Sequence, residues 1–205
     1  MARVTLFTDA FPQADENPLS SGGTWAGGYG TDNSFKVVSN QVQAVAPNVG
    51  STMTHTGALP NNQWAKIKYA ALGAAYTEVD ILLRHASPAT QSGYMAGFWR
   101  DGTGVHAQIV KITTGTQVRI GGPVDLTFAA NDEAWFEAID TTLTLYQNTT
   151  QLIQVTGEST YTSGRAGLIE YTQDAIANTL LDDFAAGGFS WGPLLSDRFS
   201  RLVIS

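Results

Sequence analysis

The sequence contains no cysteine and few basic residues. None of its 205 residues is Cys, which excludes disulfides and thiolate-bound metals. Lys and Arg number 11 against 18 Asp and Glu, so the net charge is -7. Binding to phosphate groups requires clustered Lys and Arg, and here the basic residues are spread along the chain. We therefore expect no nucleic-acid partner and no anionic membrane partner.

Long apolar runs are also missing at the start of the chain. Residues 1–9 hold no hydrophobic stretch of the length that a signal peptide or a membrane helix requires. The mature form of a secreted protein fits this start. A protein made in the cytosol and released otherwise, such as a phage virion component, fits it equally. The expected location is the virion or the extracellular space, without a recognisable signal peptide.

What the sequence does contain is the period-two pattern of β-strands. Apolar and polar residues alternate over residues 63–69 and 76–82, as in strands with one buried face. Turn-forming residues stand between such runs, for example Ser39-Asn40 and Asp101-Gly102-Thr103-Gly104. The 21 glycines agree with many short strands joined by tight turns.

About a dozen strands with short connections predict antiparallel pairing in a single large domain. The fold class that we expect is all-β, an antiparallel two-sheet jelly-roll sandwich with an apolar C-terminal extension. We place the domain at residues 1–187. Residues 188–205 include Trp191 and Phe199 and are too apolar for a solvated tail. We expect this extension to pack on the domain or to dock onto a partner chain.

The order of the segments resembles the concanavalin A-like lectin/glucanase superfamily, the laminin G-like jelly rolls. The resemblance covers roughly residues 5–187 and describes fold more than chemistry. It is carried by the following segments: Asp9-Ala10-Phe11, the Gly-rich loop to Trp25, the hairpin 35–45, the hairpin 93–112, Ala134-Trp135-Phe136, Leu143-Thr144-Leu145-Tyr146, residues 160–167 and Leu181-Asp182-Asp183-Phe184.

One candidate site follows from this resemblance. The β-glucanases of the superfamily carry Glu-x-Asp-x-x-Glu on one strand, and Glu78 and Asp80 supply the first two acids. Leu83 stands in place of the third acid. Retaining hydrolysis requires two carboxyls about 5 Å apart, and alternate strand residues are about 6–7 Å apart at the backbone. Catalysis by Glu78 and Asp80 is one interpretation; carboxylates facing solvent and lining a groove are the preferred one.

The resemblance also implies a calcium ion that ties the first strand to the last. In this part of the superfamily an acid near the last strand and backbone carbonyls hold the ion, and Asp183 precedes Phe184 as that acid does. Asp9 could approach from the first strand. The alternative is that Asp182 and Asp183 end a strand and bind backbone donors.

Aromatic residues are candidates for stacking with sugar rings. Three tryptophans lie in alternating strands and are assigned to the core or to half-buried positions: Trp64, Trp99 and Trp135. Trp25, Tyr29 and Tyr161 lie in expected loops or turns and are the candidates for a ligand-binding edge.

Histidine could serve a polysaccharide lyase, which on jelly rolls uses a His and a Tyr. His85 or His106 with Tyr94 could lie on adjoining strands. The three histidines show no His-x-His or Glu-x-x-His spacing, so we favour structural roles for them.

Two classes of function remain. The first is a non-catalytic module for glycan recognition or adhesion, or a structural module on a virion surface, of the phage decoration or fibre type. Its partner would be a glycan or a capsid or tail protein, and the chain could form a homo-oligomer. The second class is an enzyme, a glycoside hydrolase or polysaccharide lyase acting on a polysaccharide.

Overall fold

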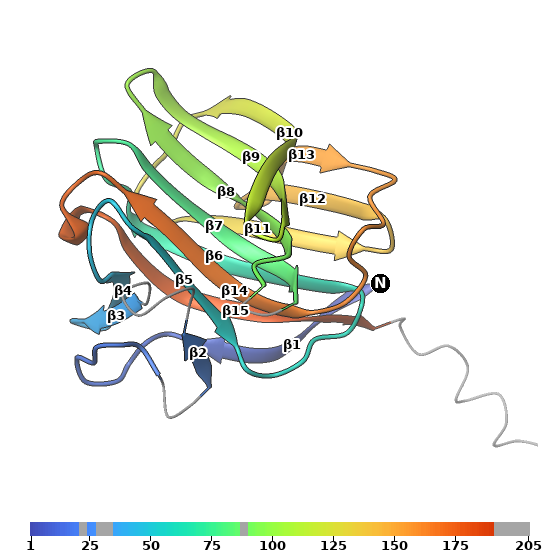
Figure 1. The fold of residues 1–205 in the computed structure, drawn as a ribbon, viewed down its shortest axis with the longest axis horizontal. Coiled ribbons are helices and arrows are strands. Elements are labelled where there is room, and N and C mark those ends of the chain that lie inside the picture. Colours follow the sequence, from blue (N-terminus) through green and yellow to red (C-terminus); the bar gives the residue numbers. More distant parts are fainter. Residues whose placement is uncertain (21–23, 28–34, 87–89, 191–205) are drawn as a thin grey trace, which may run out of the picture.

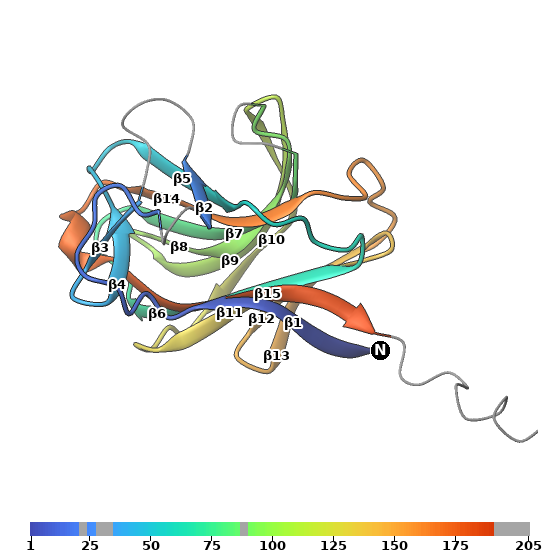
Figure 2. The ribbon, with the colours of Figure 1, turned by 90° about the horizontal axis from the view of Figure 1, so that it is seen from below.

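The computed structural model describes residues 1–20, 24–27, 35–86 and 90–190. These residues form two antiparallel β-sheets that pack face to face, as the edge-on view in Figure 2 shows. The predicted all-β, two-sheet jelly-roll sandwich is therefore confirmed. No helix of the described residues has the length and apolar character to cross a membrane.

The larger sheet, sheet A, contains eight strands (Figure 1). β1 (Ala2–Asp9) pairs with the second half of β15 (Leu180–Ser190). The other strands follow one another in this order: β13 (Thr150–Val155), β12 (Thr142–Gln147), β11 (Asp132–Ile139), β6 (Gln63–Ala71), β15 (Leu180–Ser190), β4 (Gln41–Ala44) and β3 (Phe35–Val38).

The smaller sheet, sheet B, contains seven strands, and in Figure 1 its outer face is toward the viewer. A single turn of 3-10 helix, η2 (Ile176–Asn178), leads from this sheet back to sheet A. The strands of sheet B follow in this order: β10 (Thr116–Leu126), β9 (Gly104–Thr113), β8 (Gly93–Asp101), β7 (Thr77–His85), β14 (Arg165–Thr172), β5 (Gly50–His55) and β2 (Trp25–Gly27).

The core lies between the sheets and follows the predicted alternation. In β7 the side chains of Val79, Ile81 and Leu83 belong to the main hydrophobic cluster between the sheets. The intervening side chains of β7 point to the opposite side, because successive strand residues face opposite ways. The outer face of sheet B therefore displays Glu78 and Asp80.

The predicted hairpin turns are also present. Ser39 and Asn40 have φ of 53° and 62°, the left-handed conformation of a tight two-residue turn between β3 and β4. Asp101 pairs with Gly104 at the turn between β8 and β9, as the sequence predicts.

The last strand extends beyond the domain boundary expected at residue 187. β15 continues to Ser190, which pairs with Ala2 of β1, and Gly188 pairs with Gln63 of β6. The first three residues of the expected extension are thus part of sheet A. Residues 191–205 lie outside the described residues.

Candidate functional site

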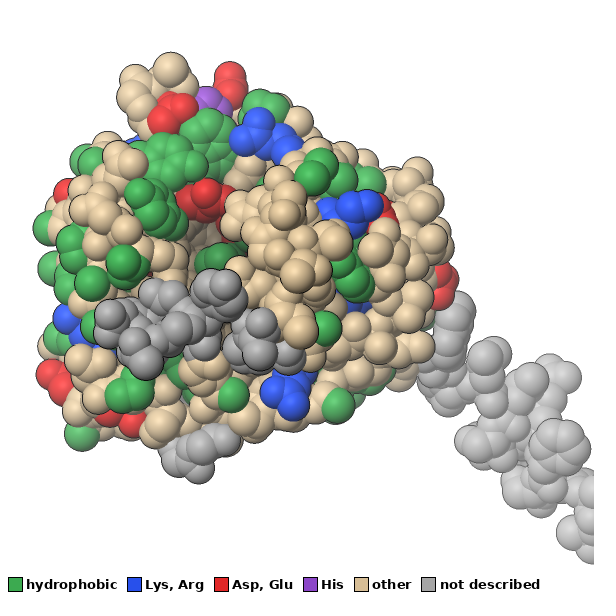
Figure 3. Space-filling model, in the orientation of Figure 1, with side chains coloured by type: hydrophobic (Ala, Val, Ile, Leu, Met, Phe, Trp, Pro, Cys, Tyr) green, Lys and Arg blue, Asp and Glu red, His purple; other side chains and the backbone are tan. Residues whose placement is uncertain are grey.

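A cavity of about 250 Å³ opens on the outer face of sheet B. Figure 3 shows this face, where acidic and hydrophobic side chains gather around a hollow. We call this cavity and its rim the sheet-B groove. Eight residues from five strands and the segments beside them line it: Gly50, Tyr76, Glu78, Asp80, Met95, Gln117, Ile169 and Tyr171.

Strand register explains why these residues meet. Across β14, β7 and β8, Tyr171 lies opposite Glu78, which lies opposite Trp99. In the next outward-facing row Ile169 lies opposite Asp80. Outward-facing side chains in register form continuous rows across a sheet. The groove is therefore assembled from residues distant in sequence.

The third member of the second row is Gly97, opposite Asp80. A Cβ atom on Gly97 would lie 2.9 Å from Oδ1 of Asp80 and 2.1 Å from the carbonyl oxygen of Val79. The absence of a side chain therefore lets the Asp80 carboxyl lie against the strand. Asp80 is 0% exposed, so it is more deeply buried than the solvent-facing carboxylate that the sequence suggests.

Burial determines the protonation of Asp80. Neither of its oxygens accepts a hydrogen bond from a donor in the described part of the chain, and its hydrogen bond is with the neighbouring acid Glu78. Burial, followed by the negative charge of Glu78 and the hydrogen bond with it, raises the pKa of Asp80 well above its usual range. A buried carboxylate without donors is strongly disfavoured, so this environment favours the protonated form of Asp80.

Glu78 is held by neighbours on other strands. Gln108 on β9 donates from Nε2 to Oε1 of Glu78 at 2.6 Å, and the Tyr76 hydroxyl lies 3.3 Å from Oε2. Arg119 on β10 donates in turn to Gln108 Oε1 at 2.9 Å. Burial and the nearby charge of Glu78 raise the pKa of Tyr76 to about 12, so Tyr76 remains a hydrogen-bond donor.

The aromatic side chains of the groove were not among the predicted ligand-binding residues. The Tyr76 ring lies 5.9 Å from that of Tyr171 and 6.0 Å from that of Trp99. Trp99 is partly exposed, in agreement with its predicted half-buried position. A signal did exist for Tyr76, because the alternation over residues 76–82 puts it on the same face as Glu78. The positions of Tyr171 and Trp99 opposite Glu78 depend on the long-range register of β14 and β8.

The structure also clarifies the incomplete glucanase pattern. Leu83, at the position of the third acid, points into the core. The next outward position after Asp80 is Leu82, which belongs to a small hydrophobic cluster on the outer face. Neither position carries a carboxyl. Glu78 and Asp80 thus share one face, as predicted, without a third acid from this strand.

The three aromatic residues predicted for a binding edge do not meet in one place. Trp25 is 4% exposed, and its ring packs 5.1 Å from the ring of Phe184. Its ring is therefore part of the core in this structure. Tyr161 is partly exposed, packs against Tyr94 and donates to Thr113 Oγ1 at 3.1 Å. Tyr29 lies outside the described residues.

The two predicted calcium ligands do lie near each other. Asp9 pairs with Phe184, and both Asp9 and Asp183 line a shallow cavity of about 220 Å³. However, Asp9 accepts hydrogen bonds from the amide of Phe11 and from Nε1 of Trp25, both at 2.8 Å. Its two oxygens therefore already serve as acceptors for neutral donors.

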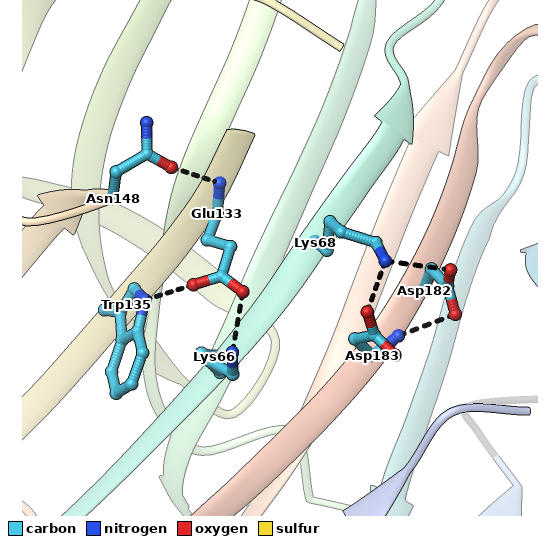
Figure 4. Close-up of polar contacts among 7 residues, drawn as sticks. All are labelled: Lys66, Lys68, Glu133, Trp135, Asn148, Asp182 and Asp183. Carbon is cyan, nitrogen blue, oxygen red and sulfur yellow. Dashed lines mark hydrogen bonds and ion pairs between the residues drawn. The ribbon is translucent and has the colours of Figure 1, made fainter. Parts of the chain in front are cut away.

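Asp183 is paired with a cation. The Lys68 ammonium lies between the carboxylates of Asp182 and Asp183, as Figure 4 shows. Lys66 also lines the cavity that Asp9 and Asp183 share. Among the described residues no group of three acidic, His or Cys side chains is arranged to hold a metal. This donor set does not fit a calcium ion, and the calcium prediction stays a prediction.

The residues of the lyase interpretation are not assembled. Tyr94 points into the core and donates to Glu158 at 3.0 Å. His106 lies on the outer face beside Trp99, with ring centroids 4.4 Å apart, and its Nδ1 lies 2.7 Å from Asp125. His85 is 1% exposed, and burial lowers its pKa to about 4.

Comparison with solved structures identifies the fold. A carbohydrate-binding module, CBM66 from Bacillus subtilis, has a TM-score of 0.60 at 13% identity, covering 78% of this chain and 91% of that one. LamAcat from Zobellia galactanivorans has a TM-score of 0.57 at 10% identity, covering 89% and 94%. The chain has the fold of the concanavalin A-like jelly rolls.

A third structure of this jelly-roll type is the CBM2 module of the evolved Dit protein of Lactobacillus casei BL23 phage J-1. Its TM-score is 0.59 at 11% identity, and the match covers 91% of this chain and 97% of that one. No protein-family model matches the sequence, and no curated protein matches it. At these identities the likeness shows the fold alone.

Proposed function

We propose that this jelly roll is a non-catalytic glycan-recognition module that binds its ligand in the sheet-B groove. The observation that carries the proposal is the buried Asp80 carboxyl, which accepts from no donor in the described part of the chain and faces a cavity that aromatic side chains border. Small-ligand sites combine apolar walls with a few polar groups that fix orientation. Tyr76 and Tyr171 supply rings for stacking, while Glu78 and Gln117 supply hydrogen-bonding groups.

The neighbours support this class of ligand. Two of the structures with this fold are described as carbohydrate-binding modules. The missing third acid on β7 favours recognition over hydrolysis, because Leu82 and Leu83 occupy the positions beyond Asp80.

The proposed setting is the surface of a virion or the extracellular space. The likeness to a module of a phage Dit protein supports it. In that setting the apolar residues 191–205 would contact a capsid or tail protein or a second copy of the chain. Co-purification of the full chain with particles, compared with a chain that ends at Ser190, tests this setting.

A glycan array with the wild type and Tyr171→Ala tests the glycan proposal. We expect specific binding by the wild type and a loss of about tenfold or more in the variant, because an aromatic contact contributes roughly 0.5–1.5 kcal/mol beyond the area that it buries. The matched control is Tyr161→Ala, since Tyr161 does not line the groove. Absence of any array ligand, or equal loss in both variants, would contradict the proposal.

One observation favours a glycoside hydrolase as the second candidate. Glu78 and Asp80 form a carboxyl pair, and the pKa of Asp80 is strongly raised, as that of the general acid often is in hydrolases. Release of reducing ends from array ligands, abolished by Glu78→Gln, would replace the binding proposal with this one.

A further inference from the structure

Two acidic side chains and no basic side chain of the described residues line the sheet-B groove. The acids are Glu78 and Asp80; the other polar lining side chains are Tyr76, Gln117 and Tyr171. Arg119 on β10 does not line the cavity. It is directed to Gln108 and to the Trp99 ring, whose centroid lies 5.7 Å from its guanidinium carbon.

Asp80 has hydrogen-bonding capacity that the protein does not use. Both of its oxygens are buried and accept no hydrogen bond from a donor in the described part of the chain, although the residue lines the cavity. Its one hydrogen-bond partner is another acid, Glu78, which Gln108 and Tyr76 also contact. A buried carboxyl that accepts from no protein donor is destabilising, so a ligand that offers donors or a positive charge at this point would relieve that penalty.

The walls of the cavity favour the same kind of group. An ammonium has three donors and no acceptor, and it is attracted to the faces of aromatic rings. The rings of Tyr76 and Tyr171 stand beside the two carboxyls. A carboxylate or phosphate group on a ligand would instead meet two acids.

The size of the cavity limits how much of the ligand enters it. Its volume of about 250 Å³ lies below the roughly 300–1,000 Å³ of pockets that enclose drug-sized ligands. One sugar ring, rather than a stretch of chain, is the unit that this space suits. The remaining residues of a glycan would lie along the sheet.

We propose that the sheet-B groove recognises an amino sugar with a free, protonated amine, which binds between Asp80, Glu78 and the two tyrosine rings. This inference rests on the proposed glycan-binding function and names its ligand class. Glycans with unacetylated amino groups, such as glucosamine oligomers, are the expected ligands. N-acetylated and uncharged oligomers of the same backbone leave the Asp80 carboxyl without a charged partner.

Proton release accompanies this recognition. Burial and the charge of Glu78 favour the protonated form of Asp80 in the free protein, and an ammonium beside it favours the carboxylate. The other titratable and charged groups near Asp80 on this face include Tyr76 just before β7, Glu78 at its start, Tyr171 on β14, Arg119 on β10, and His106 with Asp101 and Asp125. Binding of the ammonium should therefore release a proton from Asp80.

Isothermal titration calorimetry at pH 6.5 tests the inference with glucosamine, N-acetylglucosamine and glucose tetramers. We expect the glucosamine tetramer to bind at least about tenfold more tightly than the other two, since hydrogen bonds to charged groups contribute about 1.5–3 kcal/mol. The preference should vanish in Asp80→Asn and in Glu78→Gln. Titrations in buffers of different ionisation enthalpy should show proton release by the wild type and none by Asp80→Asn.

Asp125→Asn is the matched control, because it removes one negative charge from an exposed side chain outside the cavity. It should keep the preference for glucosamine. Thermal unfolding of each variant separates loss of fold from loss of binding. Equal loss of preference in Asp125→Asn would show that overall charge, and not the cavity, selects the amine.

The remaining outcomes separate this inference from the proposed function. If the three tetramers bind with equal affinity and Tyr171→Ala weakens that binding, the groove does not select an amine, and the proposed glycan-binding function is supported. If lysine amide binds as tightly as the glucosamine tetramer, the groove recognises the ammonium group and not the sugar. If no tetramer binds while other array glycans do, the proposed selection of an amino sugar is wrong and the groove binds another class of glycan. If no glycan binds at all, both proposals fail.

Discussion

Glu170 makes the stability of the protein depend on pH. It points into the core from β14, accepts a hydrogen bond from the Ala44 amide at 3.1 Å, and has one oxygen without a partner. Burial raises its pKa to about 8 from 4.5. The folded chain therefore keeps Glu170 neutral at pH values where the unfolded chain releases the proton. The free energy of unfolding should fall as pH rises from about 4.5 to about 8.

Glu170→Gln should remove this contribution of Glu170. The amide oxygen can still accept from Ala44, and no proton is lost on unfolding. We expect the variant to be more stable than the wild type at pH 8, by on the order of a few kcal/mol, with the difference shrinking toward pH 4.5. Urea unfolding at several pH values measures it. A difference that does not change with pH would show that Glu170 does not titrate between the two states.

Gly97 makes a second residue-level prediction. Gly97→Ala would place a Cβ atom 2.1 Å from the carbonyl oxygen of Val79, a rigid backbone atom. We expect a loss of about 2–3 kcal/mol in the free energy of unfolding, typical of overpacking. Gly102→Ala is the control, because nothing lies within 4 Å of a Cβ there. Similar unfolding midpoints in urea for both variants would contradict the close packing of β7 on β8.

At the scale of elements, the side chains near the pairing of β1 with β15 determine whether a calcium ion can bind there. The Lys68 ammonium pairs with both Asp182 and Asp183, and Asp9 accepts hydrogen bonds from neutral donors. We expect the melting temperature to be the same with added calcium and with a chelator. A melting temperature that falls when EDTA is added, and that no longer falls in Asp183→Ala, would restore the calcium site expected from the superfamily resemblance.

The end of β15 makes a prediction about truncation. Gly188 accepts a hydrogen bond from Nε1 of Trp64 at 3.0 Å, and Ser190 pairs with Ala2. A chain that ends at Gly187 loses these contacts, whereas one that ends at Ser190 keeps them. We expect the shorter chain to melt at a lower temperature by several degrees, since about 1–2 kcal/mol is lost. Equal melting temperatures would show that residues 188–190 contribute nothing to sheet A.

At the scale of the whole molecule, the two outer faces hold their aromatic residues in different surroundings. Sheet A also carries aromatic residues, but the Trp135 ring is already contacted by its own neighbours. Arg3 lies 4.7 Å and Lys66 lies 5.0 Å from its centroid, and Trp64 stacks on it at 5.4 Å. Figure 4 shows Trp135 donating to Glu133, which also binds Lys66.

Because these partners occupy the ring, Trp135→Ala should leave glycan affinity unchanged, and only the sheet-B groove should respond to substitution. The two faces can be compared directly by titrating an array ligand into Trp135→Ala and Tyr171→Ala. We expect the loss of about tenfold or more in affinity in Tyr171→Ala alone. Weaker binding by Trp135→Ala with an unchanged fold would move the site to sheet A.

The sequence by itself determined the fold class, the strand positions and the shared face of Glu78 and Asp80. These are local properties, because a period of two and turn residues specify strands without reference to distant segments. Only the tertiary structure decided that Tyr171 joins Glu78, that Gly97 leaves space for Asp80, and that Trp25 is buried. Those outcomes depend on which strands pair and in what register, and a single sequence contains no direct record of long-range register.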